Sequence, residues 1–246
     1  MDRAKLFAAV RRRASGVFGT SLTQGQVDGI NGILDAFATH GDGRDKTLAY
    51  ALATAYHETG ARMVPVREGF AKDDATARRI VAKRAYGEPA GKYEHVYYGR
   101  GQVQLTWLKN YDASSADASY DLVAYPDKML DPIISARVMI KGLLDGRWNG
   151  AGKGIAAYLP TNGPDDLKNA RRTVNITDKW DLIAGYYKAF LSAIQEAGGI
   201  PVDAPAPQPV PVQPKPVTIE PQPVPGGNWI DALIKAIAAI FTRKEA

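Results

Sequence analysis

Apolar residues recur with a helical period in several segments of the first 200 residues. One segment follows Thr23-Gln24-Gly25-Gln26, a capping box that predicts a helix from about residue 24. A second segment covers residues 45–59 and stops at Gly60. The faces predicted to be buried carry Val27, Ile30, Leu34 and Phe37 in the first helix, and Leu48, Leu52 and Ala55 in the second.

Two more helices are predicted later in this region. Asp131-Pro132 caps a helix that runs to about Leu144. Asp178 caps another helix, which ends at Gly198-Gly199. The face of this last helix that is predicted to be buried carries Leu182, Tyr186 and Phe190.

The stretch YYGRGQVQLTW, residues 97–107, has a different pattern. Apolar and polar residues alternate after the Gly-Arg-Gly turn, which predicts a strand with one apolar and one polar face. The polar face carries Gln102, Gln104 and Thr106, all uncharged and able to form hydrogen bonds. The sequence therefore predicts a mainly helical domain over residues 1–200, with a small β element facing something polar.

The composition changes after residue 200. Ten of the 16 prolines lie in residues 201–227, which predicts an extended linker without a core. Residues 228–246 regain helical spacing and form an amphipathic helix, which suits the surface of a membrane. Docking on the main domain or self-association are the alternatives. The predicted membrane-contact residues are Trp229, Ile230, Leu233, Ile234, Ile237 and Phe241.

Charge and composition exclude several classes of protein. The chain has 246 residues, no cysteine and a formal net charge of +5. Residues 201–246 carry four cationic and four anionic side chains, so the excess lies in residues 1–200. Disulfides and cysteine-based zinc sites are excluded, and no membrane-spanning helix, signal peptide, phosphate-binding loop or nucleic-acid motif is predicted. The positive balance suggests an anionic partner other than nucleic acid, and the alternative is that it serves solubility alone.

Two carboxylates suit acid–base chemistry. Glu58 lies on the last turn of the second predicted helix, where carbonyl dipoles favour the neutral acid that a general acid needs. The alternative is an ordinary helix-end residue that pairs with Arg62. Glu68 follows in a loop beside Arg67, which would keep it ionised. Glycoside hydrolysis uses such a pair, with one neutral carboxylic acid and one ionised carboxylate. For His57, next to Glu58, we expect a packing or hydrogen-bonding role.

The segment AYHETG, followed some forty residues later by YYGRGQVQLTWLKNY, resembles the signatures of glycoside hydrolase family 19. That family comprises plant-type chitinases and a bacterial and phage branch of peptidoglycan-cleaving lysozymes. The resemblance spans roughly residues 20–195. It implies a helical, lysozyme-like α+β fold with a short β element beside a deep cleft, and it implies no metal or cofactor.

The resemblance also implies roles for individual residues. Glu58 would protonate the glycosidic oxygen, Glu68 would activate a water molecule, and Thr106 would help to hold that water. The polar face of the strand would then look into a sugar-binding cleft. The substrate-binding side chains would be Tyr98, Gln104, Asn110 and Asn175, with Arg100 as an electrostatic brace near the carboxylates.

Some features depart from the family pattern. Ala61 replaces a glycine that often follows His-Glu-Thr-Gly. Plant chitinases have disulfides and a wider spacing between the two glutamates, so the absence of cysteine and the ten-residue spacing favour the phage branch. Loop residues align poorly, and Glu88 and Glu94 remain alternatives to Glu68.

The combined expectation is a phage or prophage endolysin. It would hydrolyse the β-1,4 bond between N-acetylmuramic acid and N-acetylglucosamine by inversion, with carboxyl groups about 6.5–9.5 Å apart. The expected partners are peptidoglycan strands and a membrane surface. The enzyme would remain in the host cytoplasm until a holin releases it to the wall. A chitinase on the same fold and a non-enzymatic lytic protein acting through residues 228–246 are the alternatives.

Overall fold

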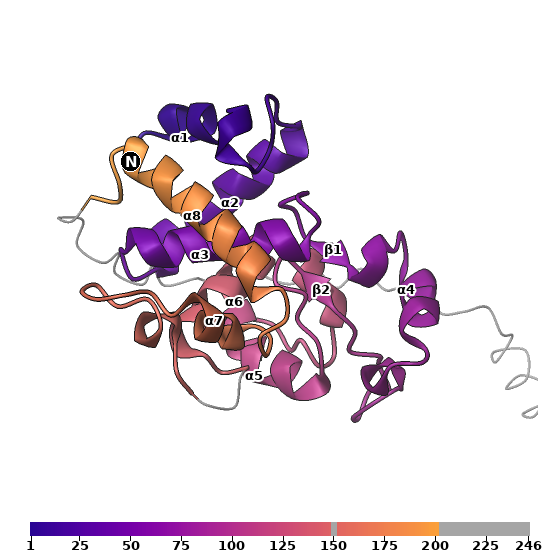
Figure 1. The fold of residues 1–246 in the computed structure, drawn as a ribbon. Coiled ribbons are helices and arrows are strands. Elements are labelled where there is room, and N and C mark those ends of the chain that lie inside the picture. Colours follow the sequence, from indigo (N-terminus) through magenta and orange to yellow (C-terminus); the bar gives the residue numbers. More distant parts are fainter. Residues whose placement is uncertain (149–151, 202–246) are drawn as a thin grey trace, which may run out of the picture. The chain divides into compact units, whose positions relative to one another are not determined.

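The computed structural model describes residues 1–148 and 152–201 (Figure 1). The predicted linker beyond Pro201 and the predicted helix of residues 228–246, with all its membrane-contact side chains, lie outside these described residues. Within them the chain is mainly helical, with one two-stranded sheet, which confirms the predicted fold class. No helix in this part of the chain is long and apolar enough to cross a membrane.

Helix α3 (Asp45–Glu58) forms the centre of the large core. Every residue from Thr47 to Ala55 is buried, so neighbouring elements cover the helix on all sides. Helix α8 (Trp180–Glu196) packs along it most extensively (Figure 1). The end of α3 is therefore a rigidly held position for a functional side chain.

Helices α2 (Gln24–His40) and α6 (Pro132–Asp145) pack against each other, and α1 (Arg3–Val10) packs against α8. The capping box of α2 is confirmed, since the Thr23 and Gln26 side chains each bind the backbone N–H of the other. The Asp131 side chain accepts hydrogen bonds at the start of α6, also as predicted.

Helix α8 corrects the sequence prediction in two respects. Its N-cap is Lys179, which has a φ of 55°, and no side chain caps the helix, so the predicted cap at Asp178 is wrong. The Asp178 carbonyl accepts a hydrogen bond from Arg171 Nε. The buried face is also shifted, so Leu182 is 44% exposed and Tyr186 only half-buried. The buried side chains of α8 are Ile183, Ala184, Tyr187, Phe190, Ala193 and Ile194.

The sheet joins a smaller lobe to the large core. Strand β1 (Val66–Arg67) pairs antiparallel with β2 (Arg100–Gly101). Between them lies the segment of residues 71–95, which contains α4 (Asp74–Val81) and which we call the α4 lobe. A second hydrophobic cluster, separate from the large core, consists of Ala77, Val81, Val96 and Tyr98.

The strand predicted within residues 97–107 is largely wrong, because only Arg100 and Gly101 lie in a strand. Residues 102–105 form a tight turn, closed by two backbone hydrogen bonds between Arg100 and Leu105 of 2.9 and 3.2 Å. The turn needs positive φ angles, 85° at Gly101 and 50° at Gln104. Gln102 is consequently buried, with Nε2 donating to the Met63 carbonyl at 2.7 Å, and it does not share a face with Gln104.

The remaining elements are short. Helix α5 (Leu108–Ala118) follows the turn of residues 102–105, and α7 (Leu167–Ala170) precedes α8 along the chain. The 3-10 helices are η1 (Arg13–Ser15), η2 (Glu68–Phe70), η3 (Ala85–Gly87), η4 (Pro126–Leu130), η5 (Ile155–Ala157) and η6 (Arg171–Thr173).

Candidate active site

A cavity of about 380 Å³ lies where the end of α3, η2, the turn of residues 100–107 and the chain after η6 meet. Six of the eight sequence-predicted site residues line it, although they come from four separate stretches of the chain. These six residues are Glu58, Glu68, Gln104, Thr106, Asn110 and Asn175.

Glu58 is the last residue of α3, and a Schellman motif ends the helix there. The Gly60 N–H donates to the His57 carbonyl at 3.2 Å, and the Ala61 N–H donates to the Tyr56 carbonyl at 2.7 Å. Backbone N–H groups therefore satisfy two of the last carbonyl groups of α3.

Arg171 is a charge partner of Glu58 that the sequence did not reveal. Its Nη2 lies 2.7 Å from Glu58 Oε1, and its side chain is only 2% exposed. A guanidinium group stabilises an ionised carboxylate, which opposes the effect expected from the helix end. The contact also fixes the Glu58 side chain, while Oε2 has no hydrogen bond within the described residues.

The alternative pairing of Glu58 with Arg62 does not occur. The Arg62 guanidinium lies 3.9 Å from the centre of the Phe70 ring and donates to the Thr59 carbonyl. Phe70 itself lines the cavity and is 50% exposed. Arg62 therefore supports an aromatic rim of the cavity rather than the carboxyl.

Glu68 is held at both carboxylate oxygens. The Tyr86 hydroxyl donates to Oε1 at 2.6 Å, and the Gly99 N–H donates to Oε2 at 2.8 Å. Burial and the hydrogen bond to Glu68 raise the pKa of Tyr86 to about 12, so the phenol remains a donor. Glu68 is thereby fixed as a hydrogen-bond acceptor in the cavity.

The glycine at position 99 is required for this approach. A Cβ added there would lie 2.8 Å from Gln104 Oε1 and 3.2 Å from Glu68 Oε2. Both distances are shorter than ordinary contacts, so a larger residue would displace the carboxylate or the amide. This explains in physical terms why the Tyr-Gly-Arg-Gly sequence suits the site.

Arg67 does not contact Glu68, although the two are adjacent in sequence. Its Nη2 binds Asp127 Oδ2 at 2.7 Å. The fallback carboxylates Glu88 and Glu94 are exposed and are not among the residues that line the cavity. Of these three candidate carboxylates, only Glu68 lies where a general base for this cavity is needed.

Gln104, Thr106 and Asn110 donate their side-chain hydrogens to backbone carbonyl groups. Gln104 Nε2 binds the Val66 carbonyl, Thr106 Oγ1 binds the Gln104 carbonyl, and Asn110 Nδ2 binds the Thr106 carbonyl. Their oxygen atoms remain acceptors for a ligand. Asn175 is the converse, since its Oδ1 accepts from the Ile176 N–H and leaves its amide hydrogens available.

Tyr98 and Arg100 do not line the cavity, contrary to prediction. Tyr98 is fully buried, and its hydroxyl donates to Asp74 Oδ1 at 2.9 Å. Arg100 is 1% exposed, stacks on Tyr98 at 3.5 Å and binds Asp127 at 2.7 Å. Alternate residues of the 97–101 segment point to opposite sides, so these two side chains lie behind the segment whose Gly99 holds Glu68.

Several aromatic residues of the cavity were missed. Tyr86, Trp107 and Trp148 line it together with Phe70. Trp107 is 45% exposed and has a φ of 76°, a conformation that bulky residues rarely adopt. Its place in the polar motif was the signal that could have revealed it, whereas nothing near Trp148 in the sequence indicates a site.

His57 also lines the cavity, in addition to the packing role expected from the sequence. Burial lowers its pKa, which favours an uncharged ring near neutral pH. Among residues 1–148 and 152–201, no three histidine or carboxylate side chains gather into a site for a metal ion. The chemistry available to the cavity is thus that of two carboxyl groups among neutral polar and aromatic side chains.

Solved structures similar to this chain are chitinases. A mutant of chitinase C is 21% identical with a TM-score of 0.39, covering 81% of this chain and 93% of its own. Chitinase C from Streptomyces griseus HUT6037 is 20% identical with a TM-score of 0.40, covering 79% and 77%. A bacterial family 19 chitinase is 22% identical with a TM-score of 0.40, covering 79% and 96%. No curated protein sequence matches the chain.

Residues 27–145 match the family model of glycoside hydrolase family 19, described as chitinase class I. The matched range contains both cavity carboxylates and the whole Tyr-Gly-Arg-Gly motif. The match agrees with the resemblance that these motifs indicated. Residues 27–145 are therefore a glycoside hydrolase family 19 domain, and the chain is a glycoside hydrolase that acts on a glycan polymer.

Proposed function

We propose that the protein is an endolysin that hydrolyses the β-1,4 bond between N-acetylmuramic acid and N-acetylglucosamine in peptidoglycan. The observation that carries the catalytic part is the presence of Glu58 and Glu68 in one cavity with Gln104, Thr106 and Asn110. The net charge of +5, all in residues 1–200, supports an anionic wall polymer as the substrate.

In this proposal Glu58 donates a proton to the glycosidic oxygen while Glu68 accepts one from water. Thr106 gives its own hydrogen to the Gln104 carbonyl, so its oxygen can accept the second hydrogen of that water. The water's lone pair is then directed at the anomeric carbon from the side opposite the leaving group, which inverts the configuration.

Arg171 has a consequence for the acid. It stabilises the ionised form of Glu58, which is the form left after proton transfer. In this mechanism the arginine favours the product side of the transfer, and it holds the carboxyl in one position before the transfer.

A chitinase is the second candidate. It is favoured by the description of the family model, chitinase class I. Chitin has the same β-1,4 linkage but lacks the lactyl ether and peptides of peptidoglycan, and the neutral polar lining of the cavity suits either sugar backbone.

Two further proposals concern access to the wall. The enzyme would wait in the host cytoplasm until a holin opens the membrane, and residues 228–246 would touch a membrane surface. The support for the second is the apolar stripe from Trp229 to Phe241. Deletion of residues 228–246 should reduce liposome binding and lysis of intact cells, and unchanged values would refute this role.

The main test is mass spectrometry of purified peptidoglycan after digestion and borohydride reduction. We expect reduced muramic acid ends with the wild type and none with Glu58→Gln, which keeps the shape but cannot supply the proton. Reduced glucosamine ends would assign a different bond. Turnover of chitin oligomers without new ends in peptidoglycan would replace the endolysin by the chitinase, and lysis that persists in Glu58→Gln would favour the non-enzymatic alternative.

A further inference from the structure

The α4 lobe, residues 71–95, carries an excess of positive charge. It contains six cationic and four anionic side chains. The cationic ones are Lys72, Arg78, Arg79, Lys83, Arg84 and Lys92, and the anionic ones are Asp73, Asp74, Glu88 and Glu94.

Some of these charged side chains are already paired with other groups of the fold. Asp74 binds Arg78 at 2.6 Å and Arg100 at 3.3 Å. Asp73 caps α4 by accepting from the Thr76 N–H at 2.7 Å. Arg78 and the two aspartates therefore have partners in the lobe itself.

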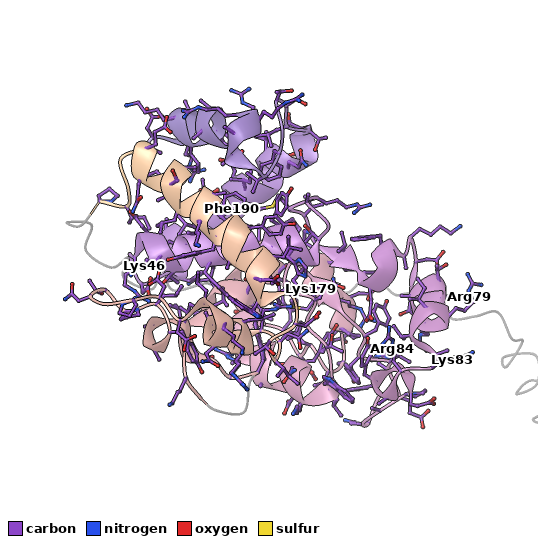
Figure 2. All side chains as sticks on the ribbon, viewed as in Figure 1. Lys46, Arg79, Lys83, Arg84, Lys179 and Phe190 are labelled. Atoms are coloured by element: carbon purple, nitrogen blue, oxygen red, sulfur yellow. The ribbon has the colours of Figure 1, made fainter. Side chains whose placement is uncertain are left out.

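Arg79, Lys83 and Arg84 remain available, and we call these three residues the α4 cationic face. All three are exposed, and none forms an ion pair within the residues that the structure describes. Arg79 makes one hydrogen bond, to Thr76 Oγ1 at 3.0 Å. Figure 2 shows their side chains at the outer part of the α4 lobe, away from α1 and α8.

Helix stabilisation does not account for the whole α4 cationic face. Cations favour the last turn of a helix because of its dipole, and Arg78 and Arg79 occupy that turn of α4. Lys83 and Arg84 lie beyond the helix end at Val81, where the dipole effect has largely decayed. Their charge thus stabilises little in the fold.

The face adjoins the cavity through Tyr86. This residue follows Arg84 by two positions, lines the cavity and donates to Glu68. The positive charge of Arg84 opposes the rise of the Tyr86 pKa. A glycan held beside Glu68 would pass near the α4 cationic face.

The lining of the cavity and the α4 cationic face suit different chemical groups of a substrate. Neutral amides, a hydroxyl and aromatic rings line the cavity and suit the sugars. The cations lie outside it, where a neutral glycan offers them nothing, whereas carboxylates attached to the glycan would pair with them.

We propose that Arg79, Lys83 and Arg84 bind carboxylates of the peptide stems that project from the glycan, and so favour peptidoglycan over neutral glycans. This inference rests on the proposed action on peptidoglycan. Under this proposal, the preference for peptidoglycan over chitin, which has the same linkage, depends on the α4 cationic face and not on the catalytic cavity.

The test compares two charge-matched variants of the full chain. Arg79→Gln/Lys83→Gln/Arg84→Gln removes the α4 cationic face. Lys5→Gln/Arg11→Gln/Arg13→Gln removes three exposed cations at and after α1, a helix that Figure 1 shows well apart from α4. Each is made with and without Glu58→Gln, so that binding can be measured without cleavage. Thermal unfolding verifies that both fold.

Binding is measured by sedimentation with insoluble purified peptidoglycan, either native or with its carboxylates amidated. The α4 variant should bind native wall roughly fivefold more weakly at low salt, and raised salt should remove the difference. It should bind amidated wall as the unsubstituted chain does. The α1 variant should keep native binding. Release of reducing ends from native wall should follow the same order.

Three results would overturn the proposal: equal losses in both variants, an α4 variant that binds native wall normally, or a loss that persists on amidated wall. The first would indicate steering by net charge alone. Failure of the proposed function looks different, because the chain with Glu58 intact would then release no reducing ends even where the α4 cationic face binds the wall.

Discussion

At the scale of single residues, the two carboxylates are controlled by different means. Glu58 is fixed by one buried guanidinium, from Arg171, whereas Glu68 is fixed by two neutral donors, the Tyr86 hydroxyl and the Gly99 N–H. Neutral donors orient a carboxylate while weakening it as a base less than a neighbouring cation would. Tyr86 is therefore a positioning residue for the proposed base.

The role of Tyr86 leads to the first prediction. Tyr86→Phe removes the hydroxyl but keeps the ring, which lies edge-on to Trp107 at 5.4 Å. Because hydrogen bonds to charged groups are stronger than neutral ones, kcat should fall about tenfold while KM changes little. Steady-state kinetics on purified peptidoglycan or chitin oligomers will measure this.

The matched control is Tyr93→Phe. Tyr93 is 39% exposed, lies in the same lobe and is not among the residues that line the cavity. It should retain wild-type kcat. If Tyr86→Phe instead raised KM with kcat unchanged, Tyr86 would act in binding rather than in positioning Glu68.

At the scale of elements, the sequence predicted the long helices and missed the turn that matters most. Caps and apolar periods were enough for α2, α3 and α6, because these signals are local. The 100–105 turn depends on positive φ at Gly101 and Gln104, which an alternating pattern conceals.

The site shows the same division between local and distant information. Residues within the two motifs could be placed in the cavity from sequence. Arg171 and Glu58 are 113 residues apart, so their pairing depends on the packing of α8 and the loop before it. Tyr98 and Arg100 were assigned to the cleft because they share the motif, although their side chains point away from it.

The Schellman motif at the end of α3 supports a second prediction. Ala61 adopts a φ of 64°, where an alanine is strained and a glycine is not. Ala61→Gly should therefore stabilise the protein by up to about 1 kcal/mol, since relief of strain exceeds the added entropy of the unfolded chain. Urea unfolding at neutral pH provides the free energy of unfolding.

The same chemical change in a helix should have the opposite sign. Ala116 is exposed in α5, and Ala116→Gly should cost roughly 1 kcal/mol. Two variants that both lose stability by this amount would show that the strain at Ala61 is already relieved by its contacts, including the hydrogen bond from Gln26 to its carbonyl.

At the scale of the whole described body, ion pairs of the buried Arg100 hold the α4 lobe against the large core. Arg100 connects the two, because it binds Asp74 of α4 and Asp127 of η4 while stacking on Tyr98. Arg67, next to Glu68, also binds Asp127. Asp127 thus neutralises a fully buried arginine and anchors the strand that leads to the proposed base.

This arrangement makes stability depend on acid pH. Burial alone would raise the pKa of Asp127, but Arg100 and Arg67 outweigh it and hold this pKa below its ordinary value. A carboxyl whose pKa is lowered by folding stabilises the protein above its unfolded pKa of about 3.9, and this stabilisation is lost as the pH falls through the folded value.

Asp127→Asn should therefore cost about 1–2 kcal/mol at pH 7, less than for a fully buried pair because the Asp127 side chain is 50% exposed. The difference from wild type should shrink below about pH 4 and vanish once the pH has fallen through the lowered pKa of folded Asp127, where both proteins lack the charge. Urea unfolding across this range will measure it, with Asp112→Asn as the control, since Asp112 is exposed in α5 and has no ion pair within the described residues. A difference that stays constant with pH would mean that Asp127 acts through packing or neutral hydrogen bonds, and that charge does not hold the α4 lobe in place.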